Sequence, residues 1–287
     1  MVELLPEADG FLVRPMTRQD LTHAYKWSLE EGWNIGRYDH DAFYATDPAG
    51  FFIGELNGEP IGSVSGVAYG ESYGFVGIYI LRPEYRGKGY GIRIFNAAME
   101  HLAGRCIGLD GVIAQQDNYR RSGFTFEYRN IRYQWKPTSS PRIPDGIVSA
   151  LDVPFELLAA YDADHFLARR DAFLSRWISL PEASPLVSVT NGRIDGFGMI
   201  RRFASGWSIG PLFADTPEIA ETLLTSLGSN HPGEDVYLDV PEVNAAALAM
   251  AKAHNMSPVF ETARMYTGPA PKLPLDEIFG VTTYELG

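Results

Sequence analysis

The sequence predicts an α/β fold of two domains, each built from strands that alternate with helices. Short, mostly apolar runs typical of strands are separated by segments with apolar residues at helical spacing. The segment WKPTSSPRIPDG (135–146) has three prolines and little to bury, which is typical of a linker or a surface crossover. The segments on its two sides follow a similar order of elements, which indicates an internal duplication. We therefore predict domains at 1–138 and 147–287, joined by a linker at 139–146.

In the first domain the predicted order is β-α-β-β-β-α-β-α-β. Thr17 is expected to cap the first helix, with Asp20 in its first turn and Gly32 at its end. Asn57-Gly58 is typical of a hairpin turn between two strands. The predicted segments are strand FLVRPMT (11–17), helix 20–32, strands GFFIGEL (50–56), PIGSVSGVAYG (60–70) and GFVGIYIL (74–81), helix 92–104, strand CIGLDGVIAQ (106–115), short helix 118–123 and strand FTFEYRNIRYQW (124–135).

The second domain echoes this order. Thr216 is expected to cap a helix whose first turn holds Pro217 and Glu218. LDG (109–111) and LDV (238–240) stand at matching places in the two copies, each before a helix that starts at an asparagine. The predicted segments are helix 164–180, a hairpin over 185–203 turning at Asn191-Gly192, strand 206–214, helix 216–228, strand 235–240, helix 244–255 and strand 258–268.

The composition is that of a globular protein, with 45% hydrophobic residues among 287. No apolar run is long enough to span a membrane, and the N-terminal residues lack the pattern of a secretory signal. Cys106 is the only cysteine, which excludes an internal disulfide and fits a reducing compartment. We therefore expect a cytoplasmic protein with no membrane partner.

The net charge of −12 argues against a nucleic-acid partner, because binding phosphate backbones requires a basic face. The charge is uneven: residues 1–138 carry −3 and residues 139–287 carry −9. The first part would hold an anionic ligand more easily. The acidic second part favours a cationic substrate, or it simply keeps the protein soluble.

The segment YILRPEYRGKGYG (79–91) places three glycines at alternate positions beside Arg86 and Lys88, between a strand and a helix. Pro83 removes a backbone donor and ends the strand. A helix N-terminus offers unpaired N–H groups and a partial positive charge, and glycine lets an anion reach the backbone without meeting a Cβ. The pattern predicts a pyrophosphate site, with an ordinary glycine-rich turn as the alternative.

Arg86-Gly87-Lys88-Gly89-Tyr90-Gly91 matches the R/Q-x-x-G-x-G/A signature of the GNAT superfamily of acetyl-CoA-dependent N-acetyltransferases. The order of elements in the first domain is similar to that family's order. The second domain resembles the same fold without the signature. The resemblance implies two tandem GNAT-type domains, each a mixed, mostly antiparallel twisted sheet flanked by helices. The first domain would be catalytic and the second degenerate.

The resemblance also implies acetyl-CoA as the cofactor, with no need for a metal. The backbone N–H groups of the glycine segment would bind the coenzyme A pyrophosphate, and the end of the preceding strand would hydrogen-bond the pantetheine arm. The implied coenzyme-binding residues are Tyr79, Ile80, Leu81, Arg86, Gly87, Lys88, Gly89, Tyr90, Gly91 and Ile92.

Tyr119 stands four residues before the pair Gly123-Phe124, as a tyrosine does in the family's pattern. The resemblance implies that its phenol protonates the leaving thiolate. The helix that carries it is shorter here than is usual in the family. The alternative is a tyrosine that only packs its ring under the helix.

A base or a chain of waters must remove a proton from the attacking amine, because an alkylamine is mostly protonated at neutral pH. Phe75 occupies the place of the glutamate that some relatives carry. Asp110 matches another acidic position of the family and is our candidate base, with a purely structural role as the alternative; Glu30 and Glu31 are its rivals. The loop after the first helix usually lines the acceptor pocket in this family. The predicted substrate-binding residues are Glu31, Trp33, Asn34 and Asp39.

The second domain lacks these parts, since Asp215 stands where phosphate would bind and Ala251 where the tyrosine should fall. We expect it to pack against the first domain and to wall the acceptor pocket. The predicted function is N-acetyl transfer to a primary amine of a small molecule (amino sugar, polyamine or amino acid) by direct attack in a ternary complex. A protein or peptide acceptor and a non-catalytic acyl-CoA sensor are the alternatives. We expect a monomer or homodimer.

Overall fold

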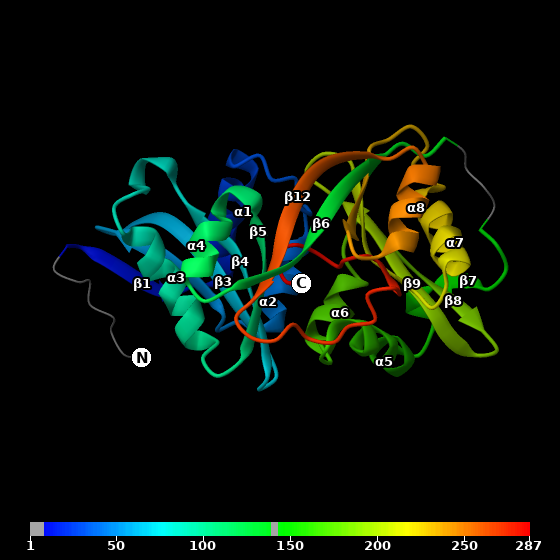
Figure 1. The fold of residues 1–287 in the computed structure, drawn as a ribbon, viewed down its shortest axis with the longest axis horizontal. Coiled ribbons are helices and arrows are strands. Elements are labelled where there is room, and N and C mark those ends of the chain that lie inside the picture. Colours follow the sequence, from blue (N-terminus) through cyan, green and yellow to red (C-terminus); the bar gives the residue numbers. More distant parts are fainter. Residues whose placement is uncertain (1–8, 139–142) are drawn as a thin grey trace.

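The computed structural model describes residues 9–138 (the first half) and 143–287 (the second half), which form two helix-flanked lobes joined by one 13-stranded sheet (Figure 1). The predicted linker at 139–146 lies partly outside the described residues. In the described chain no helix is long and apolar enough to cross a membrane. The predicted α/β class, with a mixed and mostly antiparallel sheet flanked by helices in each half, is confirmed.

Most elements of the first half lie where the sequence predicts them. The Asp20 carboxylate accepts a hydrogen bond from the backbone N–H of Thr17 (2.7 Å), and Asn57 and Gly58 turn the first hairpin with φ of 51° and 83°. The exception is helix α2, which the sequence does not predict. The elements are β1 (Phe11–Pro15), α1 (Leu21–Glu30), α2 (Asp39–Thr46), β2 (Phe51–Leu56), β3 (Glu59–Tyr69), β4 (Tyr73–Leu81), α3 (Tyr90–His101), β5 (Cys106–Val112), α4 (Gln116–Arg121) and β6 (Thr125–Trp135).

In the second half the prediction of one helix over 164–180 is wrong. The chain forms two helices there, because Leu167 adopts a left-handed conformation (φ 83°) that ends the first. Thr216 caps α7 as predicted, with its hydroxyl accepting from the N–H of Ile219 (3.4 Å). The elements are β7 (Ile147–Ser149), α5 (Phe155–Phe166), α6 (Asp171–Trp177), β8 (Ala183–Thr190), β9 (Arg193–Arg202), β10 (Trp207–Ala214), α7 (Pro217–Gly228), β11 (Val236–Pro241), α8 (Ala245–Ala253), β12 (Ser257–Tyr266) and β13 (Ile278–Gly280).

The two halves exchange strands at the centre of the sheet (Figure 1). The strand order is β1-β2-β3-β4-β5-β12-β6-β11-β10-β9-β8-β7, with β13 paired to β10. Strand β12 of the second half lies between β5 and β6 of the first, and β6 in turn lies against β11 of the second. Neither half therefore completes its part of the sheet without a strand from the other.

Two equivalent buried ion pairs hold the exchanged strands. On β6, Arg132 faces Asp239 of β11, with Nε 2.7 Å from Oδ1; on β12, Arg264 faces Asp110 of β5, with Nη2 2.6 Å from Oδ2. The aspartates belong to the LDG and LDV segments that the sequence places at matching positions in the two copies. All four side chains are almost fully buried. The two copies therefore also share a buried Arg–Asp pair that joins an exchanged strand to its neighbour.

The C-terminal segment after β12 returns between the halves and ends against the first half. The phenol of Tyr69 donates to the carbonyl oxygen of Leu286 (3.0 Å), and Arg170 donates to the hydroxyl of Thr282 (2.9 Å). Figure 1 shows the C-terminus at the centre of the molecule, beside the exchanged strands. The last residues of the chain therefore lie where the two halves meet.

Candidate active site

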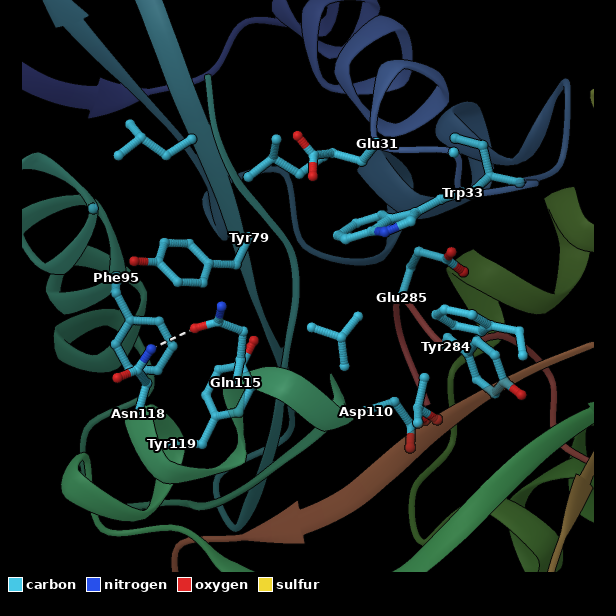
Figure 2. Close-up of a pocket in the computed structure, with 18 of the residues that line it drawn as sticks. Glu31, Trp33, Tyr79, Phe95, Asp110, Gln115, Asn118, Tyr119, Tyr284 and Glu285 are labelled. Carbon is cyan, nitrogen blue, oxygen red and sulfur yellow. Dashed lines mark hydrogen bonds between the residues drawn. The ribbon is translucent and has the colours of Figure 1, made fainter. Parts of the chain in front are cut away.

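One cavity of about 980 Å³ opens where the two halves meet, and residues of both halves line it. Figure 2 shows Tyr79, Phe95, Gln115, Asn118 and Tyr119 at one end and Trp33, Asp110, Tyr284 and Glu285 toward the other. The first end continues to the glycine segment at the start of α3. The lining from the second half consists of Tyr237, Val259, Phe260, Thr262, Tyr284 and Glu285.

Strands β4 and β5 diverge at this cavity. They pair in parallel only from Tyr73 to Val76 on β4, and beyond that point β4 continues to Leu81 without pairing β5. The pairing of β4 with β3 shifts register across residues 77–80, and Ile78 has φ of 47°, which is unusual for a β-branched residue. Strain of this kind concentrates at functional sites. Beyond Val76, β4 therefore has no β5 partner along the stretch where the pantetheine arm is predicted to bind.

The predicted coenzyme-binding residues of β4, Tyr79, Ile80 and Leu81, all line the cavity. The predicted residues of the glycine segment do not all line it. The lining includes Arg86, Gly87, Gly89, Gly91 and Ile92, whereas the structure does not place Lys88 or Tyr90 there: Lys88 lies over the ring of Tyr85, and Tyr90 packs on Phe11.

The glycine segment has the geometry of an anion site. Gly87 and Gly89 have φ of 73° and 86°, and a Cβ built at either would meet nothing within 4 Å. Gly89 is the N-cap of α3, so the free N–H groups of the first turn point at this open face. These residues therefore fit the pyrophosphate of a coenzyme A thioester.

Arg86 is already engaged within the protein. It donates from Nε to the carbonyl oxygen of Leu81 (2.8 Å) and from Nη2 to Glu31. The pair ties the glycine segment to the end of α1. The carboxylate of Glu31 faces the cavity but is committed to this guanidinium, so its predicted use in binding an amine would require that pair to open.

Tyr119 lies on α4 with its ring under Phe95 and Phe124 (centroid distances of 6.3 Å) and lines the cavity. A Cβ at Gly111 would lie 2.4 Å from Cε2 of Tyr119, so the glycine makes room for the ring. Burial, with a smaller effect of Tyr79, raises the pKa of the Tyr119 phenol above its usual value. The hydroxyl therefore stays protonated at neutral pH and is able to donate a proton.

Asp110 lines the cavity, but its carboxylate is bound by other residues of the protein. Arg264 donates to Oδ1 from Nε (3.0 Å) and to Oδ2 from Nη2 (2.6 Å), and Asn130 donates to Oδ1 (2.8 Å). Both oxygens are thus occupied, one of them twice, by donors of the protein itself. With its carboxylate held in a buried ion pair, Asp110 is better suited to its structural alternative than to the predicted role of base.

Two other acidic candidates lie away from the cavity. Glu30 is exposed and pairs with Lys26 (3.6 Å). Asp39 is buried at the start of α2, where Arg201 of β9 donates to both of its oxygens (3.0 and 3.0 Å). The prediction that Asp39 binds the substrate is therefore corrected: its charge joins the two halves.

Trp33 and Asn34, two of the residues predicted to bind the substrate, both line the cavity. The side chain of Asn34 is engaged, since it donates to the carbonyl oxygen of Ser205 (2.8 Å) and accepts from the N–H of the same residue (3.0 Å). Trp33 is the member of the predicted substrate-binding set that remains free to contact a ligand with its ring.

Sequence reasoning missed the contribution of the C-terminal segment, above all Glu285. Because this segment follows the last predicted strand and carries no motif, no local signal points to it. The structure brings Glu285 to the point where β4 leaves β5. A Cβ at Gly77 would lie only 1.9 Å from its carbonyl oxygen.

Gly77→Ala is expected to displace the C-terminal segment, because the added methyl group and that carbonyl oxygen cannot both keep their places. We expect a loss of about 1–3 kcal/mol in the free energy of unfolding, and faster amide exchange in residues 281–287. Hydrogen exchange with mass spectrometry measures the second effect. Gly268→Ala, in the C-terminal segment itself, is the control, since the nearest atom to a Cβ built there is Cys106 Sγ at 3.7 Å. Equal exchange in the two variants would contradict the prediction.

Within residues 9–138 and 143–287, no group of three or more His, Cys, Asp or Glu side chains is arranged to hold a metal ion.

Comparisons with known proteins agree with the architecture. A model described as the acetyltransferase (GNAT) family matches residues 18–124, and one described as an acetyltransferase (GNAT) domain matches residues 158–280. The chain is 29% identical over 286 residues to the holothin acyltransferase of Pseudoalteromonas sp. (strain SANK 73390), covering 99% of this chain and 97% of that protein.

Two solved structures share the fold over nearly the whole chain. One is an acetyltransferase candidate from Pyrococcus horikoshii, with a TM-score of 0.82 and 23% identity, covering 100% of this chain and 99% of that one. The other is a tandem GNAT protein from the clavulanic acid biosynthesis pathway, with a TM-score of 0.61 and 12% identity, covering 91% and 100%.

Proposed function

This chain is an acyltransferase of the GNAT superfamily, in a tandem form with two GNAT domains, and we propose that it transfers an acetyl group from acetyl-CoA to a primary amine of a small molecule. The carrying observation is that one cavity joins the glycine segment, the diverging strands and Tyr119 to a compartment walled by the second half. A thioester bound along β4 and an amine in that compartment would be in reach of each other. This supports direct attack in a ternary complex.

In the proposed mechanism, residues of the first half bind acetyl-CoA and supply the acid. Gly87, Gly89 and the first turn of α3 hold the pyrophosphate, and the backbone of β4 at Tyr79–Leu81 holds the pantetheine arm. Acetyl-CoA supplies the acyl group and a thiol leaving group. Tyr119 holds the proton that the departing sulfur takes up.

The part of the cavity that the second half walls favours an amine attached to a flat, apolar ring. Trp33, Phe260, Tyr237 and Tyr284 contribute aromatic side chains to the lining, and rings of this kind bind flat apolar groups. Polyamines and amino sugars fit less well, because they require several free carboxylates or amides, and most of those nearby are paired within the protein. The relative that acts on holothin also supports a small-molecule acceptor.

Tyr119→Phe tests the enzyme hypothesis. We expect the rate of amine-dependent thiol release from acetyl-CoA to fall about 100-fold or more, with unchanged affinity for coenzyme A by calorimetry. The panel would contain benzylamine, 4-methoxyaniline, spermidine, glucosamine and a short peptide. Tyr25→Phe, on α1 and outside the lining of this cavity, is the control and is expected to keep the wild-type rate.

The acyl-CoA sensor is the alternative from another class. It predicts that coenzyme A binds while no amine of the panel releases thiol from the wild-type protein. That outcome would overturn the proposed function. Release with the peptide alone would replace the small-molecule acceptor by a peptide.

A further inference from the structure

Three carboxylates line the cavity within the described residues, and only one of them lacks a cationic partner. Glu31 is bound by Arg86, and Asp110 is bound by Arg264. The carboxylate of Glu285 forms no ion pair among these residues and accepts one hydrogen bond, from the hydroxyl of Thr283 to Oε2 (2.6 Å). It therefore keeps lone pairs free for a ligand.

Glu285 also lies at the place where the reaction would occur. Its backbone carbonyl packs against Gly77, the residue of β4 at which the pairing with β5 has ended. Figure 2 shows its side chain beside Trp33, on the opposite side of the cavity from Tyr119. An amine between Trp33 and the diverging strands would thus have Glu285 on one side and the tyrosine beyond the acyl group.

The protein fixes this side chain with a local turn and two anchors. The hydroxyl of Thr283 accepts from the backbone N–H groups of Glu285 (2.8 Å) and Leu286 (3.3 Å) while it donates to the Glu285 carboxylate. On either side, Arg170 binds Thr282 and Tyr69 binds the carbonyl of Leu286. Because its neighbours are held, Glu285 is positioned before any ligand arrives.

We propose that Glu285, supplied by the C-terminal segment, is the catalytic base that takes the proton from the attacking amine. The inference rests on the proposed acyl transfer. The nitrogen lone pair forms the C–N bond to the acyl carbon, and the C–S bond breaks with its electron pair going to sulfur. One proton passes from nitrogen to the Glu285 carboxylate, and one passes from Tyr119 to sulfur. Exchange with solvent then returns a proton to Tyr119 and removes one from Glu285.

The electrostatic surroundings agree with this role. Burial raises the pKa of Glu285 above its usual value, Thr283 and Arg132 lower it, Asp39 raises it and Arg201 lowers it, with a net increase. A carboxylate with a raised pKa is a stronger proton acceptor than an exposed one. Of these groups, Arg132 comes from β6, Asp39 from α2 and Arg201 from β9. Arg132 is already paired with Asp239, and Arg201 is already paired with Asp39.

The activity test compares Glu285→Gln with Glu285→Asp, using acetyl-CoA and 4-methoxyaniline, an arylamine that is already neutral at pH 7. We expect kcat to fall about 100-fold or more in the glutamine variant and to recover in part in the aspartate variant. The acid limb of the wild-type kcat profile should disappear in Glu285→Gln, and the affinity for coenzyme A should not change. Glu261→Gln, an exposed carboxylate on β12 paired with Arg129, is the control and should match the wild type.

A second readout needs no turnover. The raised pKa of Glu285 means that the folded protein holds this proton more tightly than the unfolded chain does, so the contribution to stability is present below the unfolded value near 4.5 and is lost as the pH rises through the folded value. Glutamine mimics the protonated side chain. Glu285→Gln should therefore melt at a higher temperature than the wild type at pH 8, and the gain should vanish at pH 4.5 and below.

Different results would contradict the two proposals, acyl transfer and Glu285 as its base. If the wild type releases thiol and Glu285→Gln keeps both its rate and its acid limb, Glu285 is not the base, while acyl transfer stands. A fall in kcat by the same factor at every pH, together with a lower melting temperature at pH 8, would also overturn the inference in favour of a structural role. If no amine of the panel releases thiol from the wild type, the proposed function itself fails.

Discussion

Gly89→Glu is expected to abolish the binding of acetyl-CoA while leaving the fold intact. Gly89 caps α3 with φ of 86°, and nothing lies within 4 Å of the position that a Cβ would take. The new side chain would therefore enter the open face of the glycine segment, where its charge repels a pyrophosphate and competes for the helix N-terminus. We expect affinity for coenzyme A to fall at least about 100-fold, as measured by isothermal titration calorimetry.

Gly104→Glu separates the ligand effect from backbone strain. Gly104 follows the other end of α3, has φ of 84° and also has nothing within 4 Å. Both variants place a glutamate in a left-handed conformation, which destabilises each by about 1–2 kcal/mol. Only Gly89→Glu should lose coenzyme binding. Normal affinity in that variant, or an equal loss in both, would contradict the location of the pyrophosphate site.

Of the variants described, Asp239→Ala is expected to lower the free energy of unfolding the most. It leaves the guanidinium of Arg132 buried without its counter-ion at the strand exchange. Removing one partner of a buried pair destabilises a protein by about 3–5 kcal/mol. Because β6 and β12 join the two halves, we expect the sheet to lose stability as a whole. Urea denaturation followed by circular dichroism measures the change, and one cooperative transition should be kept.

The double variant Arg132→Met with Asp239→Leu completes the test. Replacing both charges by apolar side chains removes the unpaired charge, so it should destabilise less than Asp239→Ala alone. Asp117→Ala is the surface control, because its pair with Arg120 is exposed and contributes less than about 1 kcal/mol. Equal losses in Asp239→Ala and Asp117→Ala would show that the central pair does not hold the exchange.

Elements with strong local signals could be predicted from the sequence. The Asn57-Gly58 and Asn191-Gly192 turns and the Thr216 cap each depend on the backbone preferences of one or two residues, and the structure confirms them. Helix α2 and the break at Leu167 could not be predicted in this way. A leucine is not expected to adopt a left-handed conformation, so no local preference of the sequence indicates the break there.

In the candidate site, too, features with a local signal can be predicted and those set by distant contacts cannot. The glycine segment and Tyr119 belong to a contiguous pattern, and the structure brings them to one cavity. Sequence position alone identifies the acidic candidates, and it says nothing about their partners. Arginines distant in the sequence, Arg264 for Asp110 and Arg201 for Asp39, hold these carboxylates in buried ion pairs.

The two-copy α/β plan and the glycine segment can be predicted from the order of residues, because hydrophobic spacing, caps and turns act between neighbouring residues. The exchange of strands, and the identity of the carboxylate that lines the cavity without an arginine partner, depend on contacts between distant residues. Glu285 reaches the diverging strands from the far end of the chain. Contacts of that kind depend on how the halves pack, and pairing between distant strands is set by the whole sheet rather than by any one segment.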